Sequence, residues 1–466
     1  MSSLPAPFPP GFLWGAATSA YQVEGSPLAD GAGASIWHRF AHTPGRVSNG
    51  DTGDLACDHY RRFRDDVALM ADLGLGAYRF SVAWGRVLPE GRGAVNAKGL
   101  DFYRRLVDAL LERGIRPMVT LYHWDLPAAL NDRGGWLNPD CAGWFADYAQ
   151  VLFRALDDRV TLWLTLNEPW VVSVLGYLQG EVAPGHRDLF ETPRVAHHLL
   201  LAHVEAVSAY RAMGNHRIGL AVNLEPQHPA SGSPQDEDAA RRCDAFVNRW
   251  FLDPLYFGAY PQELRALFGP AWPESANADL ERLRVPPDFI GVNYYSRALV
   301  RAAPDDRPLG AVRVSAAQTP RTAMGWEVYP QGLTEILLWL KGRYANPALY
   351  ITENGSAFAD PSPSAGAIRD QERLDYLRSH LCAASAAIDR GADLRGYFAW
   401  SLLDNFEWAQ GYSKRFGLVH VDHLTQSRTP KASAGFYREV IRANGANLGC
   451  GGAPPRHRDA PPPSTA

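Results

Sequence analysis

The sequence predicts an α/β protein built as a single parallel (β/α)8 barrel, or TIM barrel. Two observations lead to this prediction: strand-like segments alternate with helical ones along the chain, and eight strand candidates can be counted. Most of the intervening stretches are helical and long enough for a right-handed crossover, so the strands should run parallel. Eight such units favour a closed barrel over an open doubly wound sheet.

The first units show the alternation clearly. Apolar residues recur at three- and four-residue intervals over 60–73, which is one face of a helix; Gly74 ends the pattern and a strand follows. The same helical pattern recurs over 100–111 and 144–155, each time before another strand. The eight strand candidates are residues 12–21, 77–84, 116–124, 161–169, 218–226, 289–296, 348–355 and 394–406.

The remaining stretches are expected to be irregular. Residues 301–325 and 356–370 have the character of long loops at one end of the barrel. The tail over 447–466 is rich in glycine and proline, which predicts disorder. We therefore expect one catalytic domain over residues 1–446, followed by the tail.

Bulk composition excludes several classes of protein. The chain has 466 residues, of which 46% are hydrophobic and 21% charged, as in ordinary globular proteins. The formal charge of −4 comes with no dense basic run, so nucleic acid and anionic membranes are not expected partners. The chain has no apolar run long enough to span a bilayer. Its start lacks the features of a secretory signal, which predicts a cytoplasmic location.

The five cysteines are scattered and form no CxxC pair. A disulfide scaffold or a zinc site is therefore not expected. The contexts of Cys57, Cys141, Cys243 and Cys382 are apolar or helical, and we expect all four to be reduced and buried.

Almost every predicted strand ends in a polar or aromatic residue. Strand-end capping would explain any one of them, but random strand ends would also show glycine, serine and lysine. In a parallel barrel all carboxyl ends lie on one face, where the loops form the active site. The residues at or near these ends are Gln22 and Glu24, Arg79 and Trp84, His123, Trp124 and Asp125, Asn167 and Glu168, Asn223 and Glu225, Asn293, Tyr294 and Tyr295, Glu353 and Asn354, and Trp400.

The chemistry of this set suggests a sugar ligand. Carboxylates and amides can hydrogen-bond vicinal hydroxyls, while aromatic faces stack on the apolar side of a pyranose ring. Metal binding is the competing interpretation. His197 and His198 are adjacent, HExxH is absent, and we expect no two histidines with ligand spacing on one element, so no metal is predicted. The absence of GxGxxG and GxxxxGK[ST] after any strand argues against a nucleotide cofactor.

Two strands end in a glutamate. LWLTLNEPW (162–170) leads to Glu168 and LYITENG (349–355) leads to Glu353. These strands face each other across an eight-strand ring, so the two carboxylic acids can meet over one pocket. Glycoside hydrolysis needs such a pair, and the distance between them, which the sequence does not supply, distinguishes a retaining from an inverting enzyme.

Seven segments resemble glycoside hydrolase family 1, the β-glucosidase family, in the right order from about Phe8 to Ile441. They are FLWGAATSAYQVEG (12–25), YRFSVAW (78–84), LYHWDLP (121–127), TLNEP (165–169), IGVNYY (290–295), ITENG (351–355) and WSLLDNFEWAQGYSKRFGL (400–418). The resemblance implies a single (β/α)8 barrel, a retaining mechanism, a small β-glycoside substrate and no cofactor.

The resemblance also implies residue roles. Glu168 matches the general acid/base and Glu353 the nucleophile, while Asn167 matches the amide that binds the sugar 2-hydroxyl. The non-reducing sugar would be held by Gln22, His123, Glu407 and Trp408, with Trp400 below it and Trp124 beside His123. Arg79, Asn293 and Tyr295 match the surroundings of the nucleophile. Trp326 resembles the aglycone platform, with Val171, Val172 and Leu175 near it.

Several alternatives remain open at this level. A carboxylate at Glu407 would repel a sugar phosphate, so a neutral sugar is favoured, although Lys414 and Arg415 are close in sequence. Gln22 and Glu407 can accommodate a galactoside or fucoside as well as a glucoside. A transglycosylase would share every residue, and a non-catalytic sugar-binding protein could use the same fold. The oligomeric state stays open.

Overall fold

Eight parallel strands close into a barrel in the computed structural model, which describes residues 8–317, 319–361 and 368–450. Successive barrel strands are neighbours around the ring, and β11 pairs with β1 to complete it. The predicted (β/α)8 barrel is confirmed, and all eight strand candidates are strands. The barrel strands are β1 (Leu13–Ala17), β2 (Ala77–Ser81), β3 (Arg116–Tyr122), β4 (Leu162–Asn167), β5 (Arg217–Asn223), β7 (Ile290–Asn293), β10 (Leu349–Asn354) and β11 (Leu394–Trp400).

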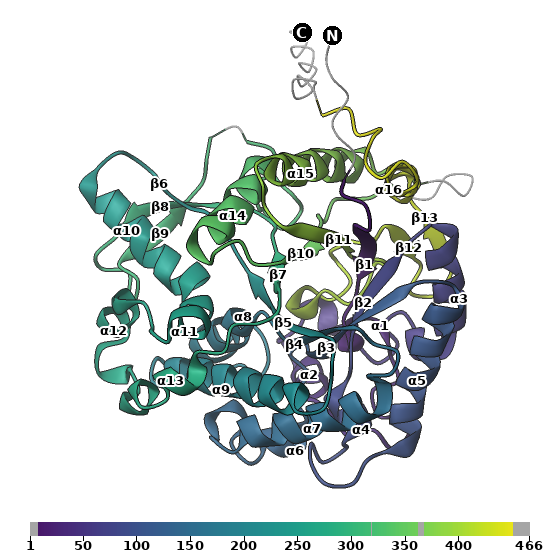
Figure 1. The fold of residues 1–466 in the computed structure, drawn as a ribbon, viewed down its shortest axis with the longest axis horizontal. Helices are drawn as coiled ribbons and strands as arrows, with labels where there is room; N and C mark the ends of the chain where they lie inside the picture. The colour runs from purple at the N-terminus through teal and green to yellow at the C-terminus, as the bar shows by residue number, and fades with distance from the viewer. Residues whose placement is uncertain (1–7, 318, 362–367, 451–466) are drawn as a thin grey trace.

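Helices surround the barrel (Figure 1). They bury one apolar face against the strands, as the periodicity predicts: Phe63, Val67 and Met70 of α3 are all buried. The larger helices are α3 (His59–Asp72), α5 (Ala97–Glu112), α7 (Cys141–Leu156), α9 (Glu191–Arg211), α10 (Pro234–Asp244), α14 (Pro330–Arg343), α15 (Gln371–Asp389) and α16 (Ala432–Arg442). The shorter ones are α1 (Ala20–Val23), α2 (Ile36–Ala41), α4 (Trp84–Val87), α6 (Ala128–Asn131), α8 (Pro169–Val174), α11 (Leu252–Phe257), α12 (Gln262–Phe268) and α13 (Leu280–Leu283).

The inside of the barrel is filled by side chains. Side chains alternate between the two faces of a strand. In β4, Leu162 and Leu164 pack with Met118, Phe289 and Phe398 in one apolar cluster, while Trp163 belongs to the larger cluster on the other face. The barrel is therefore a packed core, and an open site can exist only at its ends.

Two small sheets lie outside the barrel. The first contains β6 (Gln227–Pro229), β8 (Ala298–Ala302) and β9 (Ala311–Val314), and it packs beside α10 at the left of Figure 1. The second pairs β12 (Val419–Val421) with β13 (Arg428–Pro430). The prediction that 301–325 is a loop is therefore wrong in part, because β9 and the end of β8 fall within it. The residues described in the second predicted loop, 356–361 and 368–370, contain no helix or strand.

One cysteine prediction is wrong. Cys382 of α15 forms a disulfide with Cys450, 68 residues further along the chain, whereas Cys57, Cys141 and Cys243 are free and buried as predicted. Cys450 lies in the segment that we expected to be a disordered tail. Of that tail, the structure describes 447–450, where Leu448 is buried, and the rest lies outside the described residues. No helix among the described residues has the length and apolar character needed to cross a membrane.

Candidate active site

A cavity of about 520 Å³ opens at the carboxyl ends of the barrel strands. Glu168 from the end of β4 and Glu353 from β10 both line it. Of the other residues that the sequence singled out, those lining the cavity are His123, Trp124, Asn223, Glu225, Asn293, Tyr295, Trp326, Trp400, Glu407 and Trp408. The two glutamates that were predicted to meet therefore share one pocket, although they are 185 residues apart in the sequence.

The strands are irregular at the point where each delivers its glutamate. The pairing of β4 with β5 shifts between Leu164 and Asn167, and the pairing of β10 with β7 shifts between Ile351 and Glu353. Such irregularities re-aim side chains, and they are frequent beside active sites. Glu168 also has a left-handed backbone (φ 46°), and Pro169 begins α8 directly after it. A non-glycine residue at such an angle is held there by its surroundings, which fixes the direction of the carboxyl group.

Glu353 is surrounded by groups that stabilise a negative charge. Arg79 Nη1 donates to Glu353 Oε1 at 2.8 Å, and the Tyr295 hydroxyl donates to Glu353 Oε2 at 2.7 Å. Burial raises the pKa of Glu353, and both the guanidinium and the hydroxyl act against that rise. Arg79 and Tyr295 therefore stabilise the ionised form of Glu353 from two sides.

Glu168 is in a different environment. Its Oε1 accepts a hydrogen bond of 2.7 Å from the Asn293 amide, which is neutral. Burial, and then the charge of Glu353, raise the pKa of Glu168 to about 8. The first of the two carboxyl groups to ionise is Glu353, because it has a cationic partner. Glu168 then retains its proton at neutral pH, so one member of the pair is an acid and the other an anion.

Asn167 and Arg79 lie just behind the cavity and organise it. Arg79 Nη2 and Asn293 Nδ2 both donate to Asn167 Oδ1, at 2.5 and 3.1 Å. The amide nitrogen of Asn167 must then face His123, whose Nε2 accepts at 3.0 Å. Burial, and next the charge of Arg79, lower the pKa of His123 well below 6.5, so the ring is neutral with its proton on Nδ1. That Nδ1 has no hydrogen-bond partner among the described residues and can donate to a ligand.

Gly291 supports this network through its lack of a side chain. A Cβ atom at Gly291 would lie 2.8 Å from Oγ1 of Thr352. That hydroxyl donates to Asn293 Oδ1 at 2.7 Å and so orients the amide toward Asn167 and Glu168. A larger residue on β7 would displace Thr352 and, with it, the amide that contacts Glu168.

The far side of the cavity is aromatic. The rings of Trp124 and Trp408 pack with their centroids 4.6 Å apart, and both residues have left-handed backbones (φ 76° and 50°). The ring of His123 lies nearly parallel to those of Trp400 and Trp408, at 6.0 and 5.9 Å. These faces form a platform on which the C–H side of a sugar can stack.

Glu407 belongs to the same wall. Its Oε2 is buried without a hydrogen-bond partner among the described residues. Burial, and next the charge of Glu353, raise the pKa of Glu407 to about 8. Gln22 does not line the cavity: it is fully buried behind it, where its Nε2 donates to Asn405 Oδ1 at 3.1 Å and to the Phe406 carbonyl at 2.9 Å.

The outer part of the cavity contains predicted and unpredicted residues. Trp326 packs against Tyr295 with ring centroids 5.2 Å apart, and Val171 and Leu175 line the wall, whereas Val172 does not. Lining residues that the sequence did not single out include Trp170, Gln179, Glu181, Val182, Arg313, Met324, Gln410 and Phe416. They come from segments that follow the barrel strands: Trp170 lies on α8 and Arg313 on β9. None of them ends a barrel strand, so the strand-end pattern did not mark them.

A second hollow, of about 690 Å³, lies at the opposite end of the barrel. Three arginines that begin or lie near the starts of strands line it: Arg116, Arg217 and Arg395. Its acidic lining residue, Asp393, forms an ion pair of 2.6 Å with Arg395. The described lining of this hollow contains no pair of carboxyl groups, unlike the cavity at the opposite end.

The described residues contain one group of three potential metal ligands, and it is outside the cavity. The group is His38, His42 and Asp54. The prediction that no two histidines share ligand spacing on one element is wrong here, because His38 of α2 and His42, the residue that caps the end of this helix, are separated by about one helical turn. The prediction considered the adjacent pair of α9 and overlooked this one.

Comparisons with known proteins agree with this geometry. The chain matches glycosyl hydrolase family 1 over residues 4–446. It is 51% identical to β-glucosidase A of Thermotoga maritima, with 94% of this chain and 98% of that protein aligned. It is 50% identical to a 1,4-β-D-glucan glucohydrolase of Thermotoga neapolitana, over 94% and 99% of the two chains. The structure of a family 1 β-glucosidase from T. maritima superposes with a TM-score of 0.93 at 51% identity, covering 95% and 99%.

Proposed function

The chain belongs to glycosyl hydrolase family 1, and on this basis we propose that it is a retaining β-glucosidase that removes terminal β-D-glucosyl residues from oligosaccharides or from aryl and alkyl glucosides. It is a glycoside hydrolase, and its relatives are β-glucosidases at about half identity over nearly the whole chain. The observation that carries the proposal is the pair of glutamates in one cavity, one beside a cation and the other protonated near neutral pH.

In the first step, Glu353 attacks the anomeric carbon while Glu168 donates its proton to the leaving oxygen. The bond from the anomeric carbon to the leaving oxygen breaks, and an ester to Glu353 forms. Arg79 and Tyr295 keep Glu353 ionised before the attack, since both contact its carboxylate. The burial that raises the pKa of Glu168 keeps the proton available for donation.

In the second step, water releases the sugar from Glu353. Once Glu353 is esterified it carries no charge, so its contribution to the raised pKa of Glu168 disappears. Glu168 can then act as a base that takes a proton from the attacking water. Asn293, which contacts Glu168 at 2.7 Å, holds the carboxyl group in place through both steps.

The sugar is expected to bind on the aromatic wall. Trp400 and Trp408 offer stacking surfaces, His123 Nδ1 offers a donor and the unpaired oxygen of Glu407 offers a partner for hydroxyl groups. Asn167 would reach the 2-hydroxyl from behind Glu168, and Gln22 would act through the Asn405–Phe406 segment. Trp326, with Val171 and Leu175, would contact the aglycone.

A neutral sugar fits the cavity better than a sugar phosphate. Glu407 places a carboxyl group where a phosphate would need a cation. Neither basic residue near it in sequence lines the cavity: Lys414 donates to the Ala323 carbonyl at 2.9 Å, and Arg415 pairs with Asp404 at 2.9 Å. Short β-glucans of the cellulose type are the proposed natural class of substrate, because a relative at 50% identity is a 1,4-β-D-glucan glucohydrolase. No nucleic acid partner is proposed, since the formal charge is −4.

The proposed location is the cytoplasm, and the cysteines bear on it in opposite directions. Three buried free thiols are usual in a reducing compartment, whereas a disulfide such as Cys382–Cys450 is rare there. Alkylation of the cells at the moment of lysis, followed by mass spectrometry of the two peptides, measures how much of the bridge exists in vivo.

Glu353→Gly tests the proposal directly. The variant should not hydrolyse nitrophenyl β-glucoside, and azide or formate should restore part of the turnover by acting as the nucleophile. A 2-fluoro-glucoside should add covalently to Glu353 of the unmodified protein, which a sugar-binding protein without activity would not show. The exposed Glu112→Gln variant is the control. Full activity in Glu353→Gly would refute the assignment.

A panel of nitrophenyl glycosides separates the alternatives. The proposal expects the largest kcat/KM for the glucoside. A larger value for the galactoside or fucoside would change the sugar assigned, and a product mixture dominated by longer glycosides would indicate a transglycosylase.

A further inference from the structure

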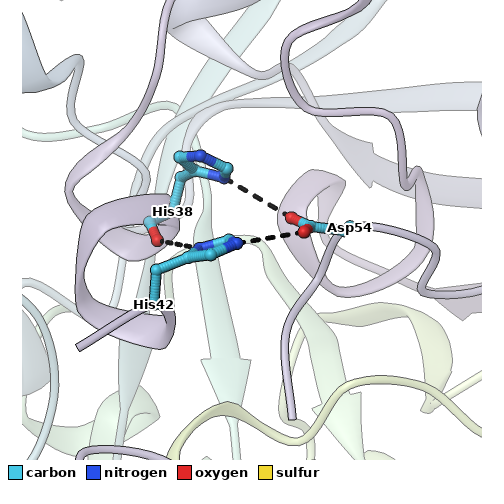
Figure 2. Close-up of side chains that lie close together, drawn as sticks. All are labelled: His38, His42 and Asp54. Carbon is cyan, nitrogen blue, oxygen red and sulfur yellow. Dashed lines mark hydrogen bonds and ion pairs between the residues drawn. The ribbon is translucent and has the colours of Figure 1, made fainter. Parts of the chain in front are cut away.

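Three potential metal ligands, none of which lines the catalytic cavity, lie close together (Figure 2). His38 is on α2, His42 follows the last residue of that helix, and Asp54 comes from the loop before α3. One ligand atom from each residue lies within 4.8 Å of the others. The side chains of His42 and Asp54 are 41% and 48% exposed, so an ion has a path from solvent.

The hydrogen bonds of His42 determine which ring nitrogen faces the cluster. Its Nδ1 lies 2.7 Å from the carbonyl oxygen of His38, which can only accept. Nδ1 must therefore carry a proton, and a neutral ring then presents the lone pair of Nε2. That nitrogen lies 3.0 Å from Asp54 Oδ2, which is also an acceptor. Two hydrogen-bond acceptors this close together repel each other unless a positive species lies between them. That species is either a second proton on the ring or a cation.

His38 adds a third acceptor. Its Nδ1 lies 3.5 Å from Asp54 Oδ1, which is too long for an ordinary hydrogen bond, and this nitrogen is buried with no partner among the described residues. An unsatisfied buried ring nitrogen costs free energy, and a cation between it and the carboxylate would satisfy it.

The spacing suits a small transition-metal ion. Ligand atoms about 2.1 Å from a tetrahedral zinc ion lie about 3.4 Å from one another. His42 Nε2 lies 3.0 Å from Asp54 Oδ2 and His38 Nδ1 lies 3.5 Å from Asp54 Oδ1, so each ring nitrogen lies at about this separation from one oxygen of the carboxylate. The carbonyl that accepts from His42 Nδ1 has the position of the partner that commonly orients a metal-bound imidazole.

We propose that His38, His42 and Asp54 form a binding site for a divalent first-row transition ion of the Zn²⁺ class, with water as the fourth ligand. Two imidazoles and one carboxylate select Zn²⁺, Co²⁺ or Ni²⁺ over Mg²⁺ and Ca²⁺, which prefer sets of oxygen ligands. The site is separate from the proposed catalytic machinery: none of its three side chains lines the cavity that contains the two glutamates.

An ion at this site would link segments that support the sugar-binding wall. On the inner side of α2, Trp37 packs against Trp408 with ring centroids 4.5 Å apart. The loop that contains Asp54 also holds Tyr412: Asp51 Oδ2 accepts from the Tyr412 backbone N–H at 3.0 Å, and the Thr52 carbonyl accepts from the Tyr412 hydroxyl at 2.7 Å. The ion would thus fasten α2 to this loop on the outside of the wall.

Titration of the full, EDTA-treated chain with ZnCl₂ in a calorimeter tests the proposal. We expect a saturable Zn²⁺ site that His42→Gln and Asp54→Asn each weaken at least tenfold, since loss of even a partner to a ligand costs 10 to 100-fold. His186→Gln is the matched control, because His186 forms a 2.7 Å pair with Glu191 and is similarly exposed but has no third ligand. This control should bind Zn²⁺ as the unmodified chain does.

Two further measurements use only the unmodified chain and therefore do not depend on whether a variant folds. Co²⁺ added to the unmodified chain should give the visible absorption of a tetrahedral ion without a thiolate charge-transfer band, and Zn²⁺ should abolish it while Mg²⁺ should not. Zn²⁺ should also raise the unfolding midpoint of the unmodified chain. Equal Zn²⁺ affinity in His42→Gln would overturn the proposal, and so would the absence of Zn²⁺ binding by the unmodified chain. If the unmodified chain does not bind Zn²⁺, the cluster is held together by a proton, as a histidine–aspartate ion pair.

Discussion

Replacing Glu168 by glutamine should make the folded protein more stable at neutral pH while it removes most of the hydrolytic activity. Glu168 is buried, and its pKa is raised from 4.5 to about 8, first by burial and then by the charge of Glu353. A raised folded pKa means that the folded chain keeps a proton that the unfolded chain releases. Glutamine has nothing to release, and its amide can still accept from Asn293.

The size of the effect follows from these two pKa values. Below about pH 4.5 Glu168 is protonated in both the folded and the unfolded chain, so it does not lower the free energy of unfolding. Between there and about pH 8 each pH unit lowers the free energy of unfolding of the unmodified protein by about 1.4 kcal/mol relative to the variant. From about pH 5.5 to about pH 7.5 the stability difference between the two proteins should therefore change by ~3 kcal/mol in favour of Glu168→Gln.

Urea unfolding followed by tryptophan fluorescence, repeated across this pH range, measures the difference. The exposed Glu112→Gln variant is the control, since water solvates that carboxyl group in both states, and its stability should follow that of the unmodified protein. If the curves for Glu168→Gln and the unmodified protein remain parallel over the whole range, Glu168 does not hold its proton through burial and the assignment of the acid fails.

Three further perturbations have defined outcomes. Arg79→Met removes the cation 2.8 Å from Glu353, so the acid limb of the kcat/KM profile should move to higher pH; an unmoved limb would contradict the role of Arg79. Glu407→Gln should lower kcat/KM for a nitrophenyl glucoside about 10 to 100-fold, mainly through KM, because a buried carboxyl partner of the sugar is lost. Cys382→Ser opens a 68-residue loop and should lower the free energy of unfolding by at most about 4 kcal/mol. A reductant should cause the same loss in the unmodified protein and none in the variant.

The barrel could be predicted from the sequence because its signals are local and repeated. Each strand candidate is an apolar run of the right length, and each amphipathic helix between two strands supplies the crossover that parallel pairing needs. The small sheet beside α10 could not be predicted in this way. Its strands β6 and β9 are three or four residues long, and β6 pairs with β8 from a distant part of the chain. Segments this short carry too little periodicity to distinguish them from loops.

The site was predictable to the extent that it lies at strand ends. Glu168 and Glu353 follow apolar strands directly, and the topology of a barrel then brings them together. The positions of Gln22 and Arg79 behind the cavity depend on side-chain packing across the ring, which sequence order does not contain. The opposite protonation of the two glutamates depends on burial and on Arg79, and these exist only in the folded chain.

The two wrong predictions about single residues have different origins. Cys382 is on a helix and Cys450 is 68 residues away, so no short spacing motif marks the pair. His38 and His42 do have a helical spacing, but α2 is only six residues long and has no extended amphipathic pattern to reveal it. The cysteine pair has no local sequence motif because its members are far apart in the chain. The histidine pair has no clear helical pattern around it because its helix is short.

The pairing of β11 with β1 has a consequence for how this protein is made. Ribosomes deliver β1 first and β11 last, so the ring has a gap until Trp400 has emerged. During most of translation the edge of β1 has no neighbour on that side, and such an edge invites pairing with other nascent chains. Expression at high rates should therefore depend on a chaperone that shields this edge, and incomplete translation products should be recovered as aggregates rather than as shorter enzymes.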